Sequence, residues 1–161
     1  ITVAWLHDIA DHKYDKDGKL KIQVYEFVQT IFDDMNDCDA IMKIIDMISY
    51  SKENNALKTG TKIDFNKELG FENACVRHIV SDADKLEALG GIGFDRCCEY
   101  TICSYKEKYG VDITNDELTK LVKIHADEKL LGLKDEFIRT KTGKQMAESL
   151  HNELIDLLNK M

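Results

Sequence analysis

Apolar residues at helical spacing, in a chain without proline, are the feature that most restricts how this sequence can fold. Between residues 20 and 35 they recur every one to four positions, at Leu20, Val24, Phe27, Val28, Ile31, Phe32 and Met35. A second series follows at Ile41, Ile44, Ile45 and Ile48. This period places apolar side chains on one face of an α-helix, so we expect helices and almost no strands.

The rest of the chain continues the same pattern. Amphipathic helices are predicted over residues 72–89, 91–108, 115–129 and 143–160, and the last two begin with capping boxes, Thr114 with Glu117 and Thr142 with Gln145. The segment 51–66 lacks the period and is predicted to be a loop or lid. The sequence GGIG at 90–93 follows no strand, which favours a close-packed helix junction over a phosphate-binding loop.

Composition limits the class of protein. A chain of 161 residues with 43% hydrophobic residues is long enough for one domain with a substantial core. Its net charge of -8 repels nucleic-acid backbones, so duplex DNA or RNA is not an expected partner. No stretch approaches the roughly 20 apolar residues of a membrane span, so a membrane is not an expected partner. Five cysteines without a C-x-x-C unit indicate reduced thiols, as in a cytoplasmic protein.

The stretch HDIADHKYD at residues 7–15 directly follows the apolar run ITVAWL. Burying an imidazole and a carboxylate costs several kcal/mol unless the two are paired or bind a metal ion. Neighbouring residues of a helix point about 100° apart, so His7 and Asp8 can hold one ion only off the edge of a helix. Such a site needs further ligands from another part of the chain.

A second acidic cluster, SDADKLEALGG at residues 81–91, supplies those ligands. Asp82 and Asp84 both lie in the predicted helix over residues 72–89, and the spacing alone leaves both open as ligands. A mixed nitrogen and oxygen ligand set suits Mn²⁺, Fe²⁺, Co²⁺, Ni²⁺ or Mg²⁺ better than a structural zinc ion. The sequence therefore predicts a divalent metal ion as cofactor.

Four segments together resemble one family. They are AWLHDIADHKYD at 4–15, SDADKLEALGGIGFDR at 81–96, HADEKLLGLKDEF at 125–137 and TKTGKQMAE at 140–148. In order and content they are similar to the motifs of HD-domain metal-dependent phosphohydrolases, in particular the small bacterial-type branch of that superfamily. The resemblance covers essentially the whole chain. It implies an all-α HD-domain helical bundle that forms a single domain over residues 1–161.

The resemblance also implies the ligands. The family binds its metal through a histidine, then a His-Asp pair, then a distant aspartate. His7 and Asp8 match the pair, and Asp84 is the preferred last ligand, with Asp82 as its competitor. The first histidine lies one helix earlier in the family, so we expect an N-terminal helix upstream of Ile1.

The function that the resemblance implies is hydrolysis of nucleoside or deoxynucleoside phosphates by a metal-activated water. Asp11, one helical turn after His7 in a continued helix, would orient or deprotonate that water. His12, Lys13 and Arg96 are expected to contact the phosphate of a small phosphorylated substrate.

Two alternatives remain open. An HD hydrolase can act on another phosphorylated small molecule, and a catalytically silent HD fold can bind a nucleotide or a protein. The missing first histidine favours the silent protein. Small helical phosphohydrolases often pair, so a homodimer is among the expected states.

Overall fold

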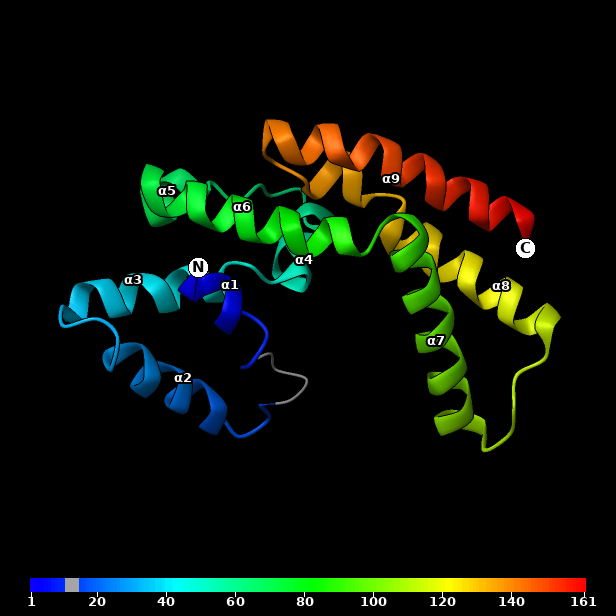
Figure 1. Ribbon diagram of the computed structural model, residues 1–161, viewed down its shortest axis with the longest axis horizontal. Helices are drawn as coiled ribbons and strands as arrows, with labels where there is room; N and C mark the ends of the chain where they lie inside the picture. Colours follow the sequence, from blue (N-terminus) through cyan, green and yellow to red (C-terminus); the bar gives the residue numbers. More distant parts are fainter. Residues whose placement is uncertain (11–14) are drawn as a thin grey trace. The chain divides into compact units, whose positions relative to one another are not determined.

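The structure is a computed structural model, and it describes residues 1–10 and 15–161 (Figure 1). In the described part the regular structure is helical and no strand occurs, which confirms the predicted all-α fold. By its internal contacts the chain divides into two compact units, Ile1–Val80 and Ser81–Met161. The single HD domain over residues 1–161 stays a prediction.

The first unit contains five helices and the start of a sixth among its described residues. They are α1 (Thr2–Leu6), α2 (Lys19–Gln29), α3 (Met35–Asp46), α4 (Tyr50–Lys58), α5 (Phe65–Leu69) and α6 (Phe71–Glu87), which continues into the second unit. Helix α3 packs against α1, α2 and α5, and it contributes Cys38, Met42, Ile44 and Ile45 to the core. Part of the apolar series that predicted these helices is thus buried around α3, including Val24, Val28, Ile44 and Ile45.

The buried stripe of α2 is narrower than its apolar sequence suggests. Val24 and Val28 are 4% and 0% exposed, whereas Phe27 and Ile31 remain 52% and 50% exposed. Helix α2 packs against α3, and these two side chains stay outside that contact. Periodicity therefore identified the helix correctly and overestimated the share of its surface that is buried.

The predicted loop at 51–66 is wrong over its first half, because α4 occupies Tyr50–Lys58. Ser49 begins this helix by accepting a hydrogen bond from the N–H of Lys52 at 3.4 Å. The helix has no apolar period because its buried residue is a carboxylate, Glu53. A helix that buries a charged group in place of an apolar stripe gives no periodic signal in the sequence.

The second unit is built from longer helices. After the end of α6 come α7 (Gly90–Tyr109), α8 (Asn115–His125), two π-helical segments η1 (Ala126–Leu130) and η2 (Leu133–Phe137), and α9 (Lys141–Lys160). Helix α7 packs against both α8 and α9. The core of this unit includes the buried residues Leu89, Leu130, Leu133, Phe137, Ile138, Ala147, Leu154 and Leu158. The π-helical segments replace the end of the helix that the sequence predicts up to residue 129.

The GGIG sequence forms the predicted helix junction. Gly90 begins α7 with a φ of 64°, in the left-handed region that glycine adopts most easily. A Cβ atom at Gly93 would lie 2.2 Å from the carbonyl carbon of Ala88. Only glycine fits at Gly93, since the turn between α6 and α7 brings the two backbones into direct contact.

The two predicted capping boxes have different outcomes. The box at the start of α8 is confirmed, with reciprocal hydrogen bonds between Thr114 and Glu117. The box at Thr142 is wrong, because α9 already begins at Lys141 and its N-cap is Thr140. Thr140 has the extended backbone of an N-cap, and its hydroxyl accepts a hydrogen bond from the N–H of Gly143 at 2.9 Å.

Candidate metal centre

His7 and Asp8 lie directly after α1, in the turn that follows the helix. Helix α1 is anchored by Val3 and Leu6, which are buried in the core of the first unit. The N–H of His7 donates to the carbonyl of Val3 at 3.0 Å, so the last turn of α1 holds this residue in place. The helix ends at Leu6, so the condition on which the expected position of Asp11 depended, a helix that continues past His7, is not met.

The imidazole of His7 is held by a single hydrogen bond that determines its tautomer. Its Nδ1 lies 2.9 Å from the carbonyl oxygen of Ala4. A carbonyl can only accept, so Nδ1 carries the proton and donates it. In the neutral imidazole, Nε2 is then left with a free lone pair. Metal-binding histidines commonly have this arrangement, in which one ring nitrogen is oriented by a carbonyl and the other is free to coordinate.

The Nε2 atom of His7 is buried and has no hydrogen-bond partner among the described residues. The whole side chain is 16% exposed. A buried acceptor without a partner costs about 1–3 kcal/mol relative to one that is hydrogen-bonded. A bound cation would satisfy this lone pair.

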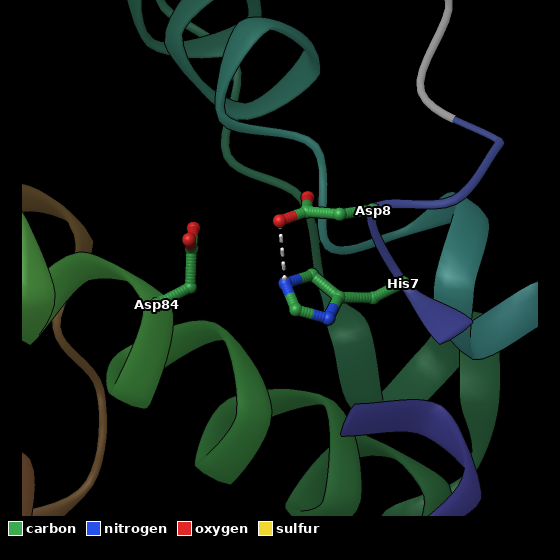
Figure 2. A group of neighbouring side chains, drawn as sticks. All are labelled: His7, Asp8 and Asp84. Atoms are coloured by element: carbon green, nitrogen blue, oxygen red, sulfur yellow. Dashed lines mark ion pairs between the residues drawn. The ribbon is translucent and has the colours of Figure 1, made fainter. Parts of the chain in front are cut away.

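Asp8 faces the same ring nitrogen. Its Oδ2 lies 3.5 Å from the Nε2 of His7, and the carboxylate is 74% exposed (Figure 2). With the ring proton on Nδ1, a lone pair and a carboxylate oxygen face each other, which is unfavourable unless a positive charge lies between them. Either a second proton on the imidazole or a metal ion supplies that charge.

Asp84 completes a group of three. It lies on α6, and ligand atoms of His7, Asp8 and Asp84 all lie within 4.8 Å of one another (Figure 2). Helix α6 is continuous from Phe71 to Glu87, so the helix that begins in the first unit also carries Asp84, four residues beyond Val80. One nitrogen and two carboxylate donors at this spacing are a suitable ligand set for a divalent cation.

Asp82 is placed differently, although it is only two residues away. Its two carboxylate oxygens accept hydrogen bonds from the N–H groups of Arg139 at 2.9 Å and Thr140 at 2.7 Å. Asp82 as a whole is only 2% exposed. Residues two apart on a helix point about 160° away from each other, so one of the pair turns toward the start of α9 and the other joins the group of three.

The remaining predicted site residues are not in this group. Arg96 lies on α7, is largely exposed, and makes a long ion pair of 3.4 Å with Glu87. Asp11, His12 and Lys13 lie outside the described residues. Their expected roles toward water and phosphate stay predictions.

The sequence analysis missed a row of buried polar residues on α6. Arg77, Ser81 and Lys85 follow each other at intervals of four, and all three are at most 2% exposed. The ammonium of Lys85 donates to the hydroxyl of Ser81. Polar residues at the positions that an amphipathic helix normally buries were the available signal, since such residues are rarely buried without a role.

A shallow, basic hollow lies at the start of α9. It has a volume of about 650 Å³ and is lined by Arg139, Lys141, Lys144, Gln145 and Glu148. Three of these five residues are basic, and the one acidic residue, Glu148, also pairs with Lys134 at 3.1 Å. This local charge is opposite to the net charge of the chain and attracts anions.

The cysteines do not favour thiol chemistry. Burial raises the pKa of the Cys97 thiol, and the neighbouring Cys98 raises it further. Burial and the nearby Asp95 also raise the pKa of Cys98. A cysteine nucleophile needs a lowered pKa, so these residues are better described as core residues.

Comparison with known proteins identifies one relative. No protein-family model matches the sequence. The chain is similar to the uncharacterized protein YpgQ of Bacillus subtilis strain 168, with 26% identity over 161 residues that cover 99% of this chain and 69% of YpgQ. The similarity therefore extends along nearly the whole sequence.

Crystal structures of YpgQ have a fold similar to that of this chain. The crystal structure of selenomethionine YpgQ from B. subtilis has a TM-score of 0.67 at 24% identity and covers 98% of this chain and 72% of that one. YpgQ in complex with ADP has a TM-score of 0.61 at 22% identity, covering 98% and 69%. Among the described residues, none of the helices has both the length and the apolar character of a membrane span.

Proposed function

We propose that this chain is a metal-dependent phosphohydrolase of the HD superfamily that acts on nucleotides. The proposal combines the resemblance of four sequence segments to that family with the group formed by His7, Asp8 and Asp84. The cofactor is a divalent ion, and Mn²⁺, Mg²⁺, Fe²⁺, Co²⁺ and Ni²⁺ all suit the mixed donor set.

The observation that carries the proposal is the state of His7. Its Nδ1–H is used by the carbonyl of Ala4, and its buried Nε2 has no hydrogen-bond partner among the residues that the structure describes. The Nε2 lone pair faces the Asp8 carboxylate at 3.5 Å, an arrangement that a cation stabilises. We infer that His7, Asp8 and Asp84 hold the ion.

A divalent ion at this position would lower the pKa of a bound water toward neutrality and offset charge on phosphoryl oxygens. The chain's own residues supply the remaining steps. The Ala4 carbonyl keeps His7 oriented, and the exposed Asp8 leaves the group open to solvent and substrate. Asp11 is proposed to take the proton from the attacking water.

The substrate side of the proposal rests on chemistry and on one relative. YpgQ has been crystallised with ADP, and its fold is that of this chain. Because the net charge is -8, the surface as a whole repels a polyphosphate, so binding requires local positive charge. The metal ion, together with His12, Lys13 and Arg96, is proposed to provide it. The long pair between Arg96 and Glu87 is weak and exposed, which leaves Arg96 available for phosphate.

A nucleotide hydrolysis screen tests this function. Purified chain is incubated with Mn²⁺ and a panel of ribo- and deoxyribonucleoside mono-, di- and triphosphates, and phosphate and pyrophosphate release is measured. We expect metal-dependent product release that is lost in Asp84→Ala. The matched control Asp95→Ala, which removes a carboxylate outside the group, should retain the wild-type rate.

The silent HD fold is the second candidate, and the relative that binds ADP is the observation that favours it. Metal-dependent nucleotide binding without any product would establish this alternative. Product release that is equal in wild type and Asp84→Ala would contradict the proposed site.

A further inference from the structure

Arg77 is the most completely buried large polar side chain of the first unit, with 0% of its surface exposed. Its Nε donates to the carbonyl of Met47 at 2.8 Å, and its Nη2 donates to Oε2 of Glu53 at 2.7 Å. The guanidinium also lies over the ring of Phe65, 3.9 Å from the centroid. The guanidinium thus contacts three different parts of the unit.

These contacts connect several helices at one point. Met47 is the C-cap of α3, Glu53 lies on α4 and Phe65 on α5, while Arg77 itself lies on α6 (Figure 1). A buried ion pair adds little net stability compared with apolar packing, because both charges lose their hydration. Its directional hydrogen bonds do, however, fix the geometry of the groups they join. The pair is therefore suited to set the position of α6 against the end of α3.

The proposed metal ligands lie on α6 itself and directly after α1, a helix that packs on α3. His7 and Asp8 are the two that follow α1. Asp84 lies seven residues after Arg77 on α6, which corresponds to a rise of about 10.5 Å and a rotation only about 20° short of two full turns. A shift or rotation of α6 against α3 would move Asp84 relative to His7 and Asp8 without breaking either helix.

We propose that Arg77 is a positioning residue for the metal centre. By joining the C-cap of α3 to Glu53 and α6, it fixes the distance from Asp84 to the His7 and Asp8 pair. This inference rests on the proposed function only in assuming that the three residues bind a metal ion. Arg77 acts through the backbone of α6 and has no assigned contact with the ion or the substrate.

Titration with Co²⁺ tests the proposal, because its visible spectrum reports coordination geometry as well as occupancy. Affinity and spectrum are measured for the full chain, for Arg77→Met and for the milder Arg77→Lys, which keeps the charge toward Glu53. Thermal unfolding in the presence of a chelator gives the stability of each variant. Val28→Ala is the matched control, since it opens a cavity in the same core on α2, which carries none of the ligands.

We expect Arg77→Met to bind Co²⁺ up to roughly 10-fold more weakly, at the low end of the range found when a residue bonded directly to a metal ligand is lost, because Arg77 acts only through the backbone of α6. Its spectrum should change, and Arg77→Lys should fall between Arg77→Met and wild type. Val28→Ala should lose stability and keep both the affinity and the spectrum. If Arg77→Met does not fold, Arg77→Lys alone decides the question.

The possible failures can be told apart. Arg77 variants that match Val28→Ala in Co²⁺ affinity and spectrum would overturn the positioning role and leave the metal centre intact. A wild-type chain that binds no Co²⁺ would overturn the metal centre itself, and the positioning role with it.

Discussion

At the scale of single residues, one hydrogen bond decides what His7 can do. Because the Ala4 carbonyl takes the Nδ1 proton, the buried Nε2 has a lone pair that no described residue satisfies. The roles of the two neighbouring aspartates of α6 likewise depend on the groups that surround each carboxylate. Asp84 joins His7 and Asp8, while Asp82 binds two backbone N–H groups at the start of α9.

The two aspartates should therefore respond differently to substitution. Asp84→Ala is expected to weaken metal binding by at least roughly 10–100-fold, since a ligand matters no less than its outer partners, with little effect on stability. Asp82→Ala should instead lower the free energy of unfolding by about 1–3 kcal/mol, because two partly buried N–H groups lose their acceptor. Metal titration and urea unfolding of both variants measure the two effects.

A further variant, Asp84→Asn, separates the charge of this side chain from its shape. Asp84→Asn keeps the shape and removes the charge, so it should still lower metal affinity. If Asp82→Ala weakens metal binding more than Asp84→Ala does, the ligand assignment within the second acidic cluster is off by two residues.

At the scale of helices, sequence reasoning succeeded where the apolar period is strong. The predicted helix over 91–108 corresponds to α7 at Gly90–Tyr109, and the one over 143–160 to α9 at Lys141–Lys160. Sequence reasoning did not predict α4, whose buried residue is Glu53, or the buried contacts of Arg77. A pair that is 24 residues apart and charged leaves no local period in the sequence.

The candidate site was also predicted only in part from the sequence. The motifs pointed to His7, Asp8 and Asp84, and the structure brings these three together. The distinction between Asp84 and Asp82 needed three-dimensional information, because it depends on which side of α6 faces the start of α9. Metal binding itself stays a prediction.

The corrected start of α9 gives a prediction at this scale. Thr140→Ala should lower the free energy of unfolding by about 1 kcal/mol, because the N–H of Gly143 loses its cap. Thr142→Ala removes the same side chain from an exposed position inside the first turn and should change stability by less than about 0.5 kcal/mol. Urea unfolding of the two variants compares them directly. A larger loss in Thr142→Ala would place the cap at Thr142 after all.

At the scale of the whole molecule, α6 is the helix that carries both Arg77 and the proposed ligand Asp84. The boundary between the two compact units falls within it, after Val80. Its first part carries Arg77 in the core of the first unit, and its last part carries Asp82 and Asp84. Tests of the metal centre therefore need the full chain, since residues 1–80 alone lack Asp84.

If His7 is a metal ligand, its removal should prevent metal binding, and the metal content of the purified chain measures this directly. Wild type, His7→Ala and His151→Ala are loaded with Mn²⁺, freed of excess ion and analysed for bound metal. His151 is the matched control, because its Nδ1 is also buried without a hydrogen-bond partner among the described residues, and it lies on α9 outside the group. We predict near-stoichiometric metal in wild type and His151→Ala and none in His7→Ala. Equal metal content in wild type and His7→Ala, or no metal in wild type, would contradict this prediction.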